Sequence, residues 1–190
     1  MSAPFELLIA VILMGFVLFA GFTAIQQLQQ QTCVNTIHSQ LEKLGRNLQN
    51  VATGKGSAQF QFSLEGCSAR INDCAQFSQL ASAGQEVECI QLQDSTDPNI
   101  CSSYCSSARS VCSLLIYRSA KYDTTIKCVD ISPSTVFPAQ GSQQCPDRSL
   151  EGWVLQDFTT STIRQGTYSL LKGSELTATV PIVCAYYRQG

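Results

Sequence analysis

Residues 7–25 read LLIAVILMGFVLFAGFTAI, nineteen consecutive residues without a formal charge. At a rise of about 1.5 Å per residue, such a run forms a helix long enough to cross the ~30 Å hydrocarbon layer of a membrane. One carboxylate, Glu6, stands directly before the run, and no Lys or Arg occurs before Lys43. The sequence therefore predicts an apolar N-terminal helix whose single acidic residue needs an explanation.

Three kinds of segment begin with such a run. A secretory signal peptide has a basic region, roughly 7–15 apolar residues and a small-residue cleavage site, and residues 1–25 match none of these cleanly. A signal anchor has the right length but carries basic residues on its cytoplasmic side, which Met1–Phe5 lacks. The third kind is a chain whose basic leader has been removed, leaving an apolar helix that waits in the membrane and later packs into a helical polymer.

Glu6 has two interpretations. A carboxylate in an apolar segment costs about 2.5–3.5 kcal/mol at mid-membrane and less near an end, so it benefits from a partner. In a polymer, the α-amino group of a neighbouring subunit, with an ordinary pKa of about 7.7–8, can pair with Glu6 and set the axial register. In the other interpretation Glu6 lies at the membrane interface, where the helix macrodipole favours an acid in the first turn. Chemistry alone does not choose between them.

The N-terminal residues Ser2-Ala3-Pro4-Phe5-Glu6-Leu7-Leu8-Ile9, followed by an apolar helix, resemble the start of mature type IV pilins. The resemblance is strongest to archaeal type IV pilin-like subunits with class III signal peptides, and it covers about the first 25 residues. In that family a prepilin peptidase removes a short basic leader, and a glutamate, usually fifth in the mature chain, is the characteristic polar residue. Glu6 is fifth counted from Ser2 and sixth counted from Met1.

The resemblance implies a subunit that is inserted in the membrane before pilus assembly machinery builds it into a homopolymer. Archaeal flagellins share this processing and architecture, but their usual N-terminal sequence is not seen, so a pilus is favoured over an archaellum. The expected polymer interface comprises Met1, Glu6, Leu7, Leu8, Ile9, Val11, Ile12, Leu13, Phe16, Val17, Phe19, Phe22 and Ile25. Gly15 and Gly21 are either close-approach sites between helices or, more economically, tolerated glycines.

The helix is predicted to continue beyond the apolar run. After the polar residues 26–31, apolar residues recur at spacings of four and three, at Ile37, Leu41, Leu44, Leu48 and Val51. This spacing places them on one buried side of a helix. Pro4 is harmless in a first turn and the next proline is Pro98, so one helix of roughly 70 Å is expected from about residue 4 to residue 51. His38, the single histidine, is expected to be solvated or hydrogen-bonded.

The predicted fold class is α+β: a long N-terminal helix in residues 1–53, then a disulfide-rich, mainly antiparallel, sandwich-like β head in residues 54–190. Residues 54–57, Gly-Lys-Gly-Ser, are a helix stop and turn, and about 135 residues follow, enough for one core. Short helices or cysteine-rich loops are expected within residues 72–82 and 101–110. Strands, several with one buried and one solvated face, are expected at residues 59–64, 86–92, 112–118, 124–131, 152–158, 168–172 and 175–188.

Ten cysteines lie outside the apolar run: Cys33, Cys67, Cys74, Cys89, Cys101, Cys105, Cys112, Cys128, Cys145 and Cys184. Their even number predicts disulfides and an oxidising, extracellular location. The competing use is zinc at Cys101, Cys105 and Cys112, but this cluster lacks histidine and paired Cys-x2-Cys knuckles. Connectivity is not derivable, except that Cys33, alone on the helix, should bond to the head.

Charge and motifs indicate no catalytic or nucleic-acid role. The net charge is −2 without a basic stripe, and no phosphate-binding glycine loop is present. The single histidine lies in the predicted helix, so the head cannot assemble a Ser-His-Asp or Cys-His site. We expect no enzyme activity, cofactor or metal.

The predicted function is that of a major pilin, the structural subunit of an extracellular surface filament that serves adhesion. The alternative is a minor pilin or a single-pass membrane-anchored surface protein whose head binds a ligand, and an archaellum subunit is less favoured.

Overall fold

The computed structural model describes residues 3–64, 67, 70–106, 110–174 and 180–188, leaving aside the side chains of residues 3–7 and 70. Its first element, α1, is a continuous helix from Ala3 to Ala52. The helix ends because Gly54 adopts a left-handed φ of 76°. The N–H of Gly54 donates to the carbonyl of Val51, and the N–H of Lys55 donates to that of Asn50, so two carbonyls of the last turn are satisfied.

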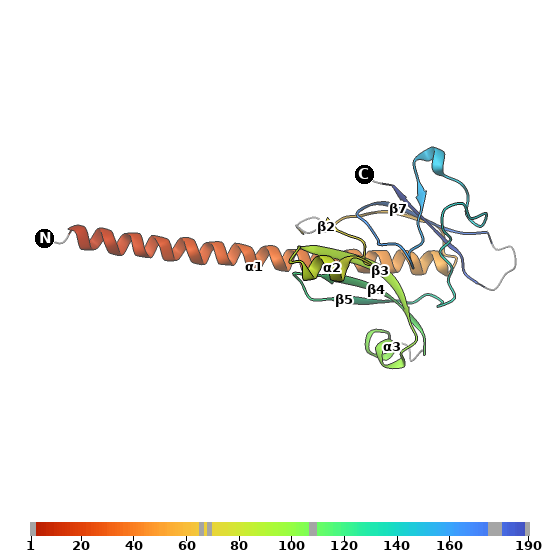
Figure 1. Cartoon of the computed structure of the whole chain (residues 1–190), viewed down its shortest axis with the longest axis horizontal. Coiled ribbons are helices and arrows are strands. Elements are labelled where there is room, and N and C mark those ends of the chain that lie inside the picture. Colours follow the sequence, from red (N-terminus) through yellow and green to blue (C-terminus); the bar gives the residue numbers. More distant parts are fainter. Residues whose placement is uncertain (1–2, 65–66, 68–69, 107–109, 175–179, 189–190) are drawn as a thin grey trace.

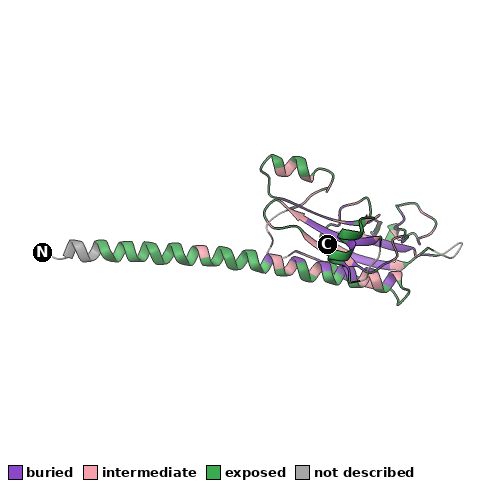
Figure 2. Ribbon diagram, turned by 90° about the horizontal axis from the view of Figure 1, so that it is seen from below, coloured by how far each residue is buried: buried purple, intermediate pink, exposed green. Residues whose placement is uncertain are grey.

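The two halves of α1 differ in their surroundings. Figure 1 shows the first half projecting from the head as a rod and the second half running along the head. Figure 2 shows the exposed first half and the partly buried second half. Cys33 is the first buried residue described along the chain, and the predicted seam of Ile37, Leu41, Leu44, Leu48 and Val51 is buried throughout. The head is therefore assembled on the second half of its own helix.

Two four-stranded sheets form the head. One has the strand order β1-β7-β8-β6 and comprises β1 (Ala58–Phe62), β7 (Gly166–Lys172), β8 (Val183–Arg188) and β6 (Val154–Leu155). The other has the order β2-β3-β4-β5 and comprises β2 (Arg70–Ile71), β3 (Val87–Ser95), β4 (Cys112–Ser119) and β5 (Thr125–Val129). All strand pairs are antiparallel except β2 with β3.

The main core is shared by α1 and one face of each sheet. Leu41 and Leu44 of α1 lie in one cluster with Phe60 and Tyr168 from the first sheet and Tyr117 from the second. Aromatic rings tie the cluster together, with the Tyr168 ring centroid 5.8 Å from that of Phe60 and 5.5 Å from that of Phe158. Because the helix supplies a whole buried stripe, neither sheet has to close the core alone.

The outer face of each sheet carries a small core of its own. On the β2-β3-β4-β5 sheet, Leu114 and Ile116 pack with cysteines of the short helix α3 (Pro98–Tyr104). On the β1-β7-β8-β6 sheet, Tyr186 and Cys184 pack with Cys145 and Trp153. Central residues of β4 and β8 are consequently buried on both faces. The expectation of one solvated face holds for β1, with its alternating burial, but not for β4 and β8, because chain segments cover their outer sides.

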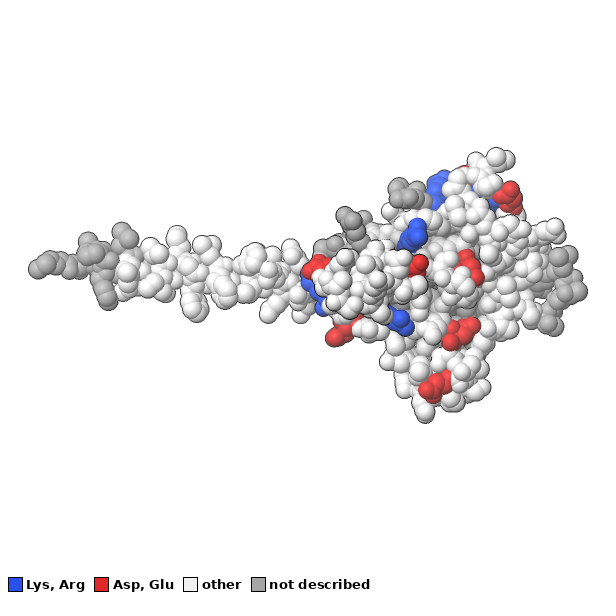
Figure 3. Space-filling model, in the orientation of Figure 1, with Lys and Arg blue, Asp and Glu red and all other residues white. Residues whose placement is uncertain are grey.

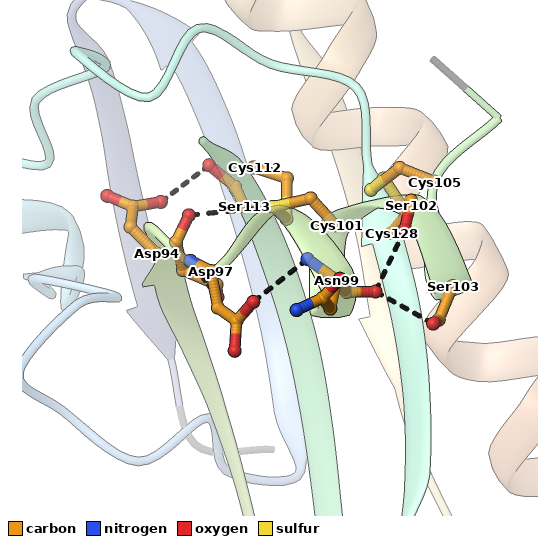
Figure 4. Close-up of a disulfide and its surroundings, with 11 residues drawn as sticks. Asp94, Asp97, Asn99, Cys101, Ser102, Ser103, Cys105, Cys112, Ser113 and Cys128 are labelled. Carbon is orange, nitrogen blue, oxygen red and sulfur yellow. Dashed lines mark hydrogen bonds between the residues drawn. A yellow bond between two sulfur atoms is a disulfide. The ribbon is translucent and has the colours of Figure 1, made fainter. Parts of the chain in front are cut away.

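All ten cysteines form disulfides: Cys33–Cys67, Cys74–Cys89, Cys101–Cys112, Cys105–Cys128 and Cys145–Cys184. The first joins the helix to the head, as expected for Cys33. Figure 4 shows Cys101–Cys112 and Cys105–Cys128 beside α3, whose first turn is capped by the carboxylate of Asp97 accepting the Asn99 N–H at 2.8 Å. The cluster considered for zinc is thus divided between two disulfides.

The predicted fold class is confirmed: the chain is α+β, with a long N-terminal helix, mainly antiparallel sheets and five disulfides. Of the two segments considered for helices, residues 72–82 contain α2 (Phe77–Ser82), whereas α3 begins at Pro98, before the segment 101–110, and overlaps only its first four residues. The strand predicted at residues 152–158 is reduced to β6, because Phe158 turns into the main core and its carbonyl accepts the N–H of Leu92. In the segment predicted at 175–188, β8 begins at Val183, and residues 175–179 lie outside the described part.

Candidate polymer interface on the exposed helix

The projecting half of α1 exposes large apolar side chains around its whole circumference. Between Leu8 and Ile25 their exposed fractions run from 43% at Ile9 to 73% at Phe16. Side chains on such a helix repeat every 3.6 residues, so an apolar run without gaps covers every direction. A helix that is apolar all round is normally buried in a core or a membrane. This segment, as a single subunit, lacks the surroundings that its composition requires.

The predicted interface residues fall into two groups. Ten of them share high exposure on the projecting half, namely Leu8, Ile9, Val11, Ile12, Leu13, Phe16, Val17, Phe19, Phe22 and Ile25. Met1 lies outside the described residues, as do the side chains of Glu6 and Leu7, although the backbone of the latter two is helical. The structure therefore does not place the Glu6 carboxylate or its partner.

Three further residues have the same exposure and were not among the predicted contacts. Met14 and Leu18 are 70% and 69% exposed, and Leu28 is 63% exposed beyond the end of the apolar run. Met14 and Leu18 could have been found, since they belong to the uncharged run. The sequence did not indicate Leu28 as an interface residue, because polar glutamines flank it on both sides.

The threonine hydroxyls of the projecting half are satisfied within the helix. The hydroxyl of Thr23 donates to the carbonyls of Phe19 and Ala20, at 3.2 and 2.9 Å. The hydroxyl of Thr32 donates likewise to the carbonyl of Leu28 at 2.9 Å. Such bonding lets a threonine lie in an apolar environment without an unpaired donor. Thr23, the hydroxyl residue of the apolar run, therefore adds no unpaired donor to this surface.

Two glycines interrupt this apolar surface because they carry no side chain. A Cβ added at Gly15 or Gly21 would meet no other atom within 4 Å. Nothing within the subunit requires a small residue at either position. Each glycine costs helix stability of about 0.5–1 kcal/mol relative to alanine. They remain candidate sites for close approach of a second helix.

Among the side chains that the structure describes, Lys, Arg, Asp and Glu lie on the head and on the second half of α1. Figure 3 shows acidic and basic side chains scattered over the visible face of the head, and none on the described part of the rod. The first charged residues after the apolar run are Glu42 and Lys43, and Glu42 contacts Arg46 at 3.9 Å across one helical turn. Apart from Glu6, whose side chain lies outside the described residues, the rod therefore carries no formal charge that would repel an identical copy.

A shallow groove lies where the rod meets the head. It lies between α1 and the turn from β4 to β5, is lined by His38, Val34 and Tyr122 among others, and encloses about 800 Å³. The predicted polar environment of His38 agrees with this position, since glutamine and asparagine side chains also line the groove. No cluster of metal-ligating side chains occurs among the described residues.

α1 is the one helix in the described part of the chain that is long and apolar enough to cross a membrane, and none of its most apolar window is buried within the subunit. Comparison with known protein families, with characterised proteins and with solved structures finds no match to this chain.

Proposed function

We propose that this protein is the structural subunit of an extracellular filament of the type IV pilus class, polymerised through its N-terminal helix. The observation that carries the proposal is the apolar surface of residues 8–28, which is exposed on all sides of a rod that projects from a folded head. Bundling such rods would bury this surface at a filament axis and place the heads outside.

The energy of such packing is large. At about 25 cal/mol per Å², a helix that buries on the order of 1,000 Å² of apolar surface gains ~25 kcal/mol before the costs of association. The lack of formal charge from residue 7 to residue 41 and the hydrogen-bonded hydroxyl of Thr23 leave little beyond Glu6 to oppose burial. Polymerisation would therefore be close to irreversible without a motor, in keeping with the assembly machinery and prepilin peptidase that the resemblance implies.

The head supports an extracellular location. Five disulfides persist only where the environment is oxidising, outside the cytosol of most cells. They are spread over the main core and both outer faces rather than gathered at one reactive site. In this proposal the helix waits in the membrane while the head folds and oxidises on the outer side, and the filament then serves surface adhesion.

The test is cryo-electron microscopy of material sheared from the native cell surface, for the unaltered protein and two variants. The proposal expects helical filaments with residues 8–25 at the axis. Glu6→Ala should reduce filament yield strongly while the head stays folded, because it removes the carboxylate proposed to set axial register. The matched control Glu42→Ala, which removes an exposed carboxylate of the same helix, should assemble normally.

Two outcomes would contradict the proposal. Normal filament yield from Glu6→Ala would remove the register role of that residue. Protein found only as detergent-soluble monomers, with the rod in lipid, would overturn the filament itself.

The second outcome would favour the alternative, a minor pilin or a single-pass anchored surface protein whose head binds a ligand. The specific observation behind this alternative is that α1 is long enough to span a membrane by itself. A filament subunit should be abundant and resist detergent extraction, whereas an anchored monomer should dissolve readily.

A further inference from the structure

A cavity of about 410 Å³ lies on the outer face of the β1-β7-β8-β6 sheet, and we refer to it as the head pocket. The loop of residues 140–149 forms one side, and Trp153, Leu155 and Tyr186 form the other. The Cys145–Cys184 disulfide fastens the loop to β8. The volume falls in the range of about 300–1,000 Å³ that is usual for small-molecule sites. In Figure 1 this part of the chain, drawn in cyan, stands in the half of the head away from the N-terminus.

The guanidinium of Arg148 organises the head pocket. It lies 5.0 Å from the ring centroid of Trp153 and 5.5 Å from that of Tyr186. Its Nε and Nη2 donate to Glu151 at 3.1 and 2.6 Å, and its Nη1 donates to the hydroxyl of Ser169 at 3.0 Å. Stacking and an ion pair, in which Nε and Nη2 both donate to Oε2 of Glu151, hold this side chain in one position. Its positive charge is already balanced by Glu151.

Several hydrogen-bonding groups that line the pocket remain unused. Among the described residues, the indole N–H of Trp153 and the side-chain amides of Gln140 and Gln143 make no hydrogen bond, and Nη1 and Nη2 of Arg148 each keep one further N–H. Asp147 is exposed and accepts the Ser149 N–H at 2.9 Å, which leaves acceptor positions on its carboxylate. Hydrogen bonds from Ser149 lower the pKa of Asp147, so this acceptor stays ionised.

The charges at the pocket disfavour ionic ligands. Arg148 is paired with Glu151, and Arg188, outside the lining, lies 4.9 Å from the Trp153 ring centroid, so that guanidinium groups already occupy places over the indole. The carboxylate of Asp147 lines the cavity and would repel an anion, while the two guanidinium groups by the Trp153 ring leave no place there for a cation to stack. What remains is a neutral ligand that both donates and accepts hydrogen bonds, and hydroxyl groups do both.

We propose that the head pocket binds a neutral, hydroxyl-rich saccharide, with Asp147 accepting from its hydroxyls and Trp153, Arg148 and the two glutamines completing the hydrogen bonds. Recognition runs through hydrogen bonds, because cations already lie over the Trp153 ring. The proposal goes beyond filament assembly and does not depend on it, since every residue involved lies on the head of one subunit.

The test measures saccharide binding to the full chain dispersed in a zwitterionic detergent without a sugar headgroup. Ligand-observed saturation-transfer NMR and titration calorimetry would be run with glucose, galactose, mannose and N-acetylglucosamine, with glucuronate and inorganic phosphate as anionic probes. The expected result is saturable binding of at least one neutral sugar and weaker binding of glucuronate and phosphate.

Asp147→Asn supplies the decisive variant, because it removes the charge while keeping the size of the side chain. Asp147 is exposed, so the fold should survive, and affinity should fall about tenfold with loss of a charge-assisted hydrogen bond. Asp97→Asn is the matched control: Asp97 likewise accepts the N–H two residues on, but it caps α3 outside the pocket, and its replacement should leave binding unchanged.

Three results would overturn the saccharide proposal: no neutral sugar binds, anions bind better than their neutral counterparts, or Asp147→Asn binds as well as the Asp97→Asn control. Filament formation is scored separately by microscopy. Filaments without saccharide binding would refute the pocket and leave the filament proposal intact, and saccharide binding without filaments would do the reverse.

Discussion

Residues 8–28 and residues 33–51 belong to one uninterrupted helix, yet the apolar side chains of the first segment are exposed and those of the second are buried. The first segment is apolar on all sides and exposed, whereas the second has one apolar seam that is buried in the core of the head. The difference lies in the width of the apolar surface. A single stripe can be covered by two sheets of the same chain, but a fully apolar cylinder can be covered only by lipid or by other copies. One helix therefore builds the core of the head with one half and, in the filament proposal, associates with other subunits through the other half.

The difference between the two halves of α1 is tested most strongly by truncating one leucine in each half. Leu44→Ala should lower the free energy of unfolding by about 2–5 kcal/mol, because it opens a cavity in the fully buried seam. Leu18→Ala, at a position that is 69% exposed, should change it by less than about 0.5 kcal/mol.

Both variants can be compared by denaturant titration, following the fluorescence of Trp153, the single tryptophan, which is packed in the head. Equal destabilisation by the two substitutions would refute the division of α1 into a folding half and an associating half.

The Cys33–Cys67 disulfide joins α1 to the head where the buried half of the helix begins, and its contribution to stability is tested by removing it. The bond closes a loop with a sequence separation of 34 residues, so the double variant Cys33→Ala, Cys67→Ala should lose about 2–4 kcal/mol of stability. Cys101→Ala, Cys112→Ala is a useful comparison, since that bond spans a separation of 11 and should cost less. Midpoints of thermal unfolding under non-reducing conditions give the order, and a larger loss from the shorter loop would contradict it.

The smallest effect concerns Glu88, a carboxylate of β3 that is fully buried in the head. Neither of its oxygens accepts a well-formed hydrogen bond from a described residue. Burial raises its pKa above the ordinary value, and repulsion from Glu86 adds to this, whereas the Tyr117 hydroxyl and the positive charge of Lys121 oppose it. A carboxyl whose pKa is raised on folding favours the folded state while protonated, so the contribution of Glu88 to stability is fully present in acid and is lost as the pH rises above about 4.5 toward the folded pKa.

Glu88→Gln should remove this pH dependence and raise stability at neutral pH by on the order of 1 kcal/mol, because the neutral amide avoids the cost of burying a charge. Glu42→Gln, at an exposed position, should keep the wild-type slope. Unfolding titrations between pH 3 and pH 8 measure the slope, and an unchanged profile in Glu88→Gln would contradict the assignment.

The sequence predicted the features that follow from pattern alone. The uncharged run of residues 7–25 and the four-and-three spacing from Ile37 to Val51 indicated one long helix and its buried side, and Gly54 indicated its end. The solitary position of Cys33 indicated that its partner would come from the head. Each of these depends on residues that are neighbours in the sequence or on simple elimination.

What could not be predicted depends on contacts between distant residues. No residue near β8 indicates that its outer face is covered by a loop about 40 residues earlier in the chain. In β4, apolar and polar residues do not alternate, because both faces of the strand are buried. The head pocket arises from the same long-range packing, since Arg148, Trp153 and Tyr186 meet beside the Cys145–Cys184 bond that fastens the 140–149 loop to β8. The candidate interface was predictable as a run of residues, whereas the exposure of Leu28 required the structure.

The Cys33–Cys67 bond also has a mechanical consequence. It sits at the first buried turn of α1, where an axial pull on the rod first reaches the head. Without it, such a pull would separate the seam from Ile37 onward one turn at a time, breaking few contacts at each step. With it, the tension passes into a covalent bond, and the seam is loaded in shear as a unit. Pulling the rod away from the head of a subunit therefore requires breaking a sulfur–sulfur bond or shearing the whole seam, rather than parting one leucine contact at a time.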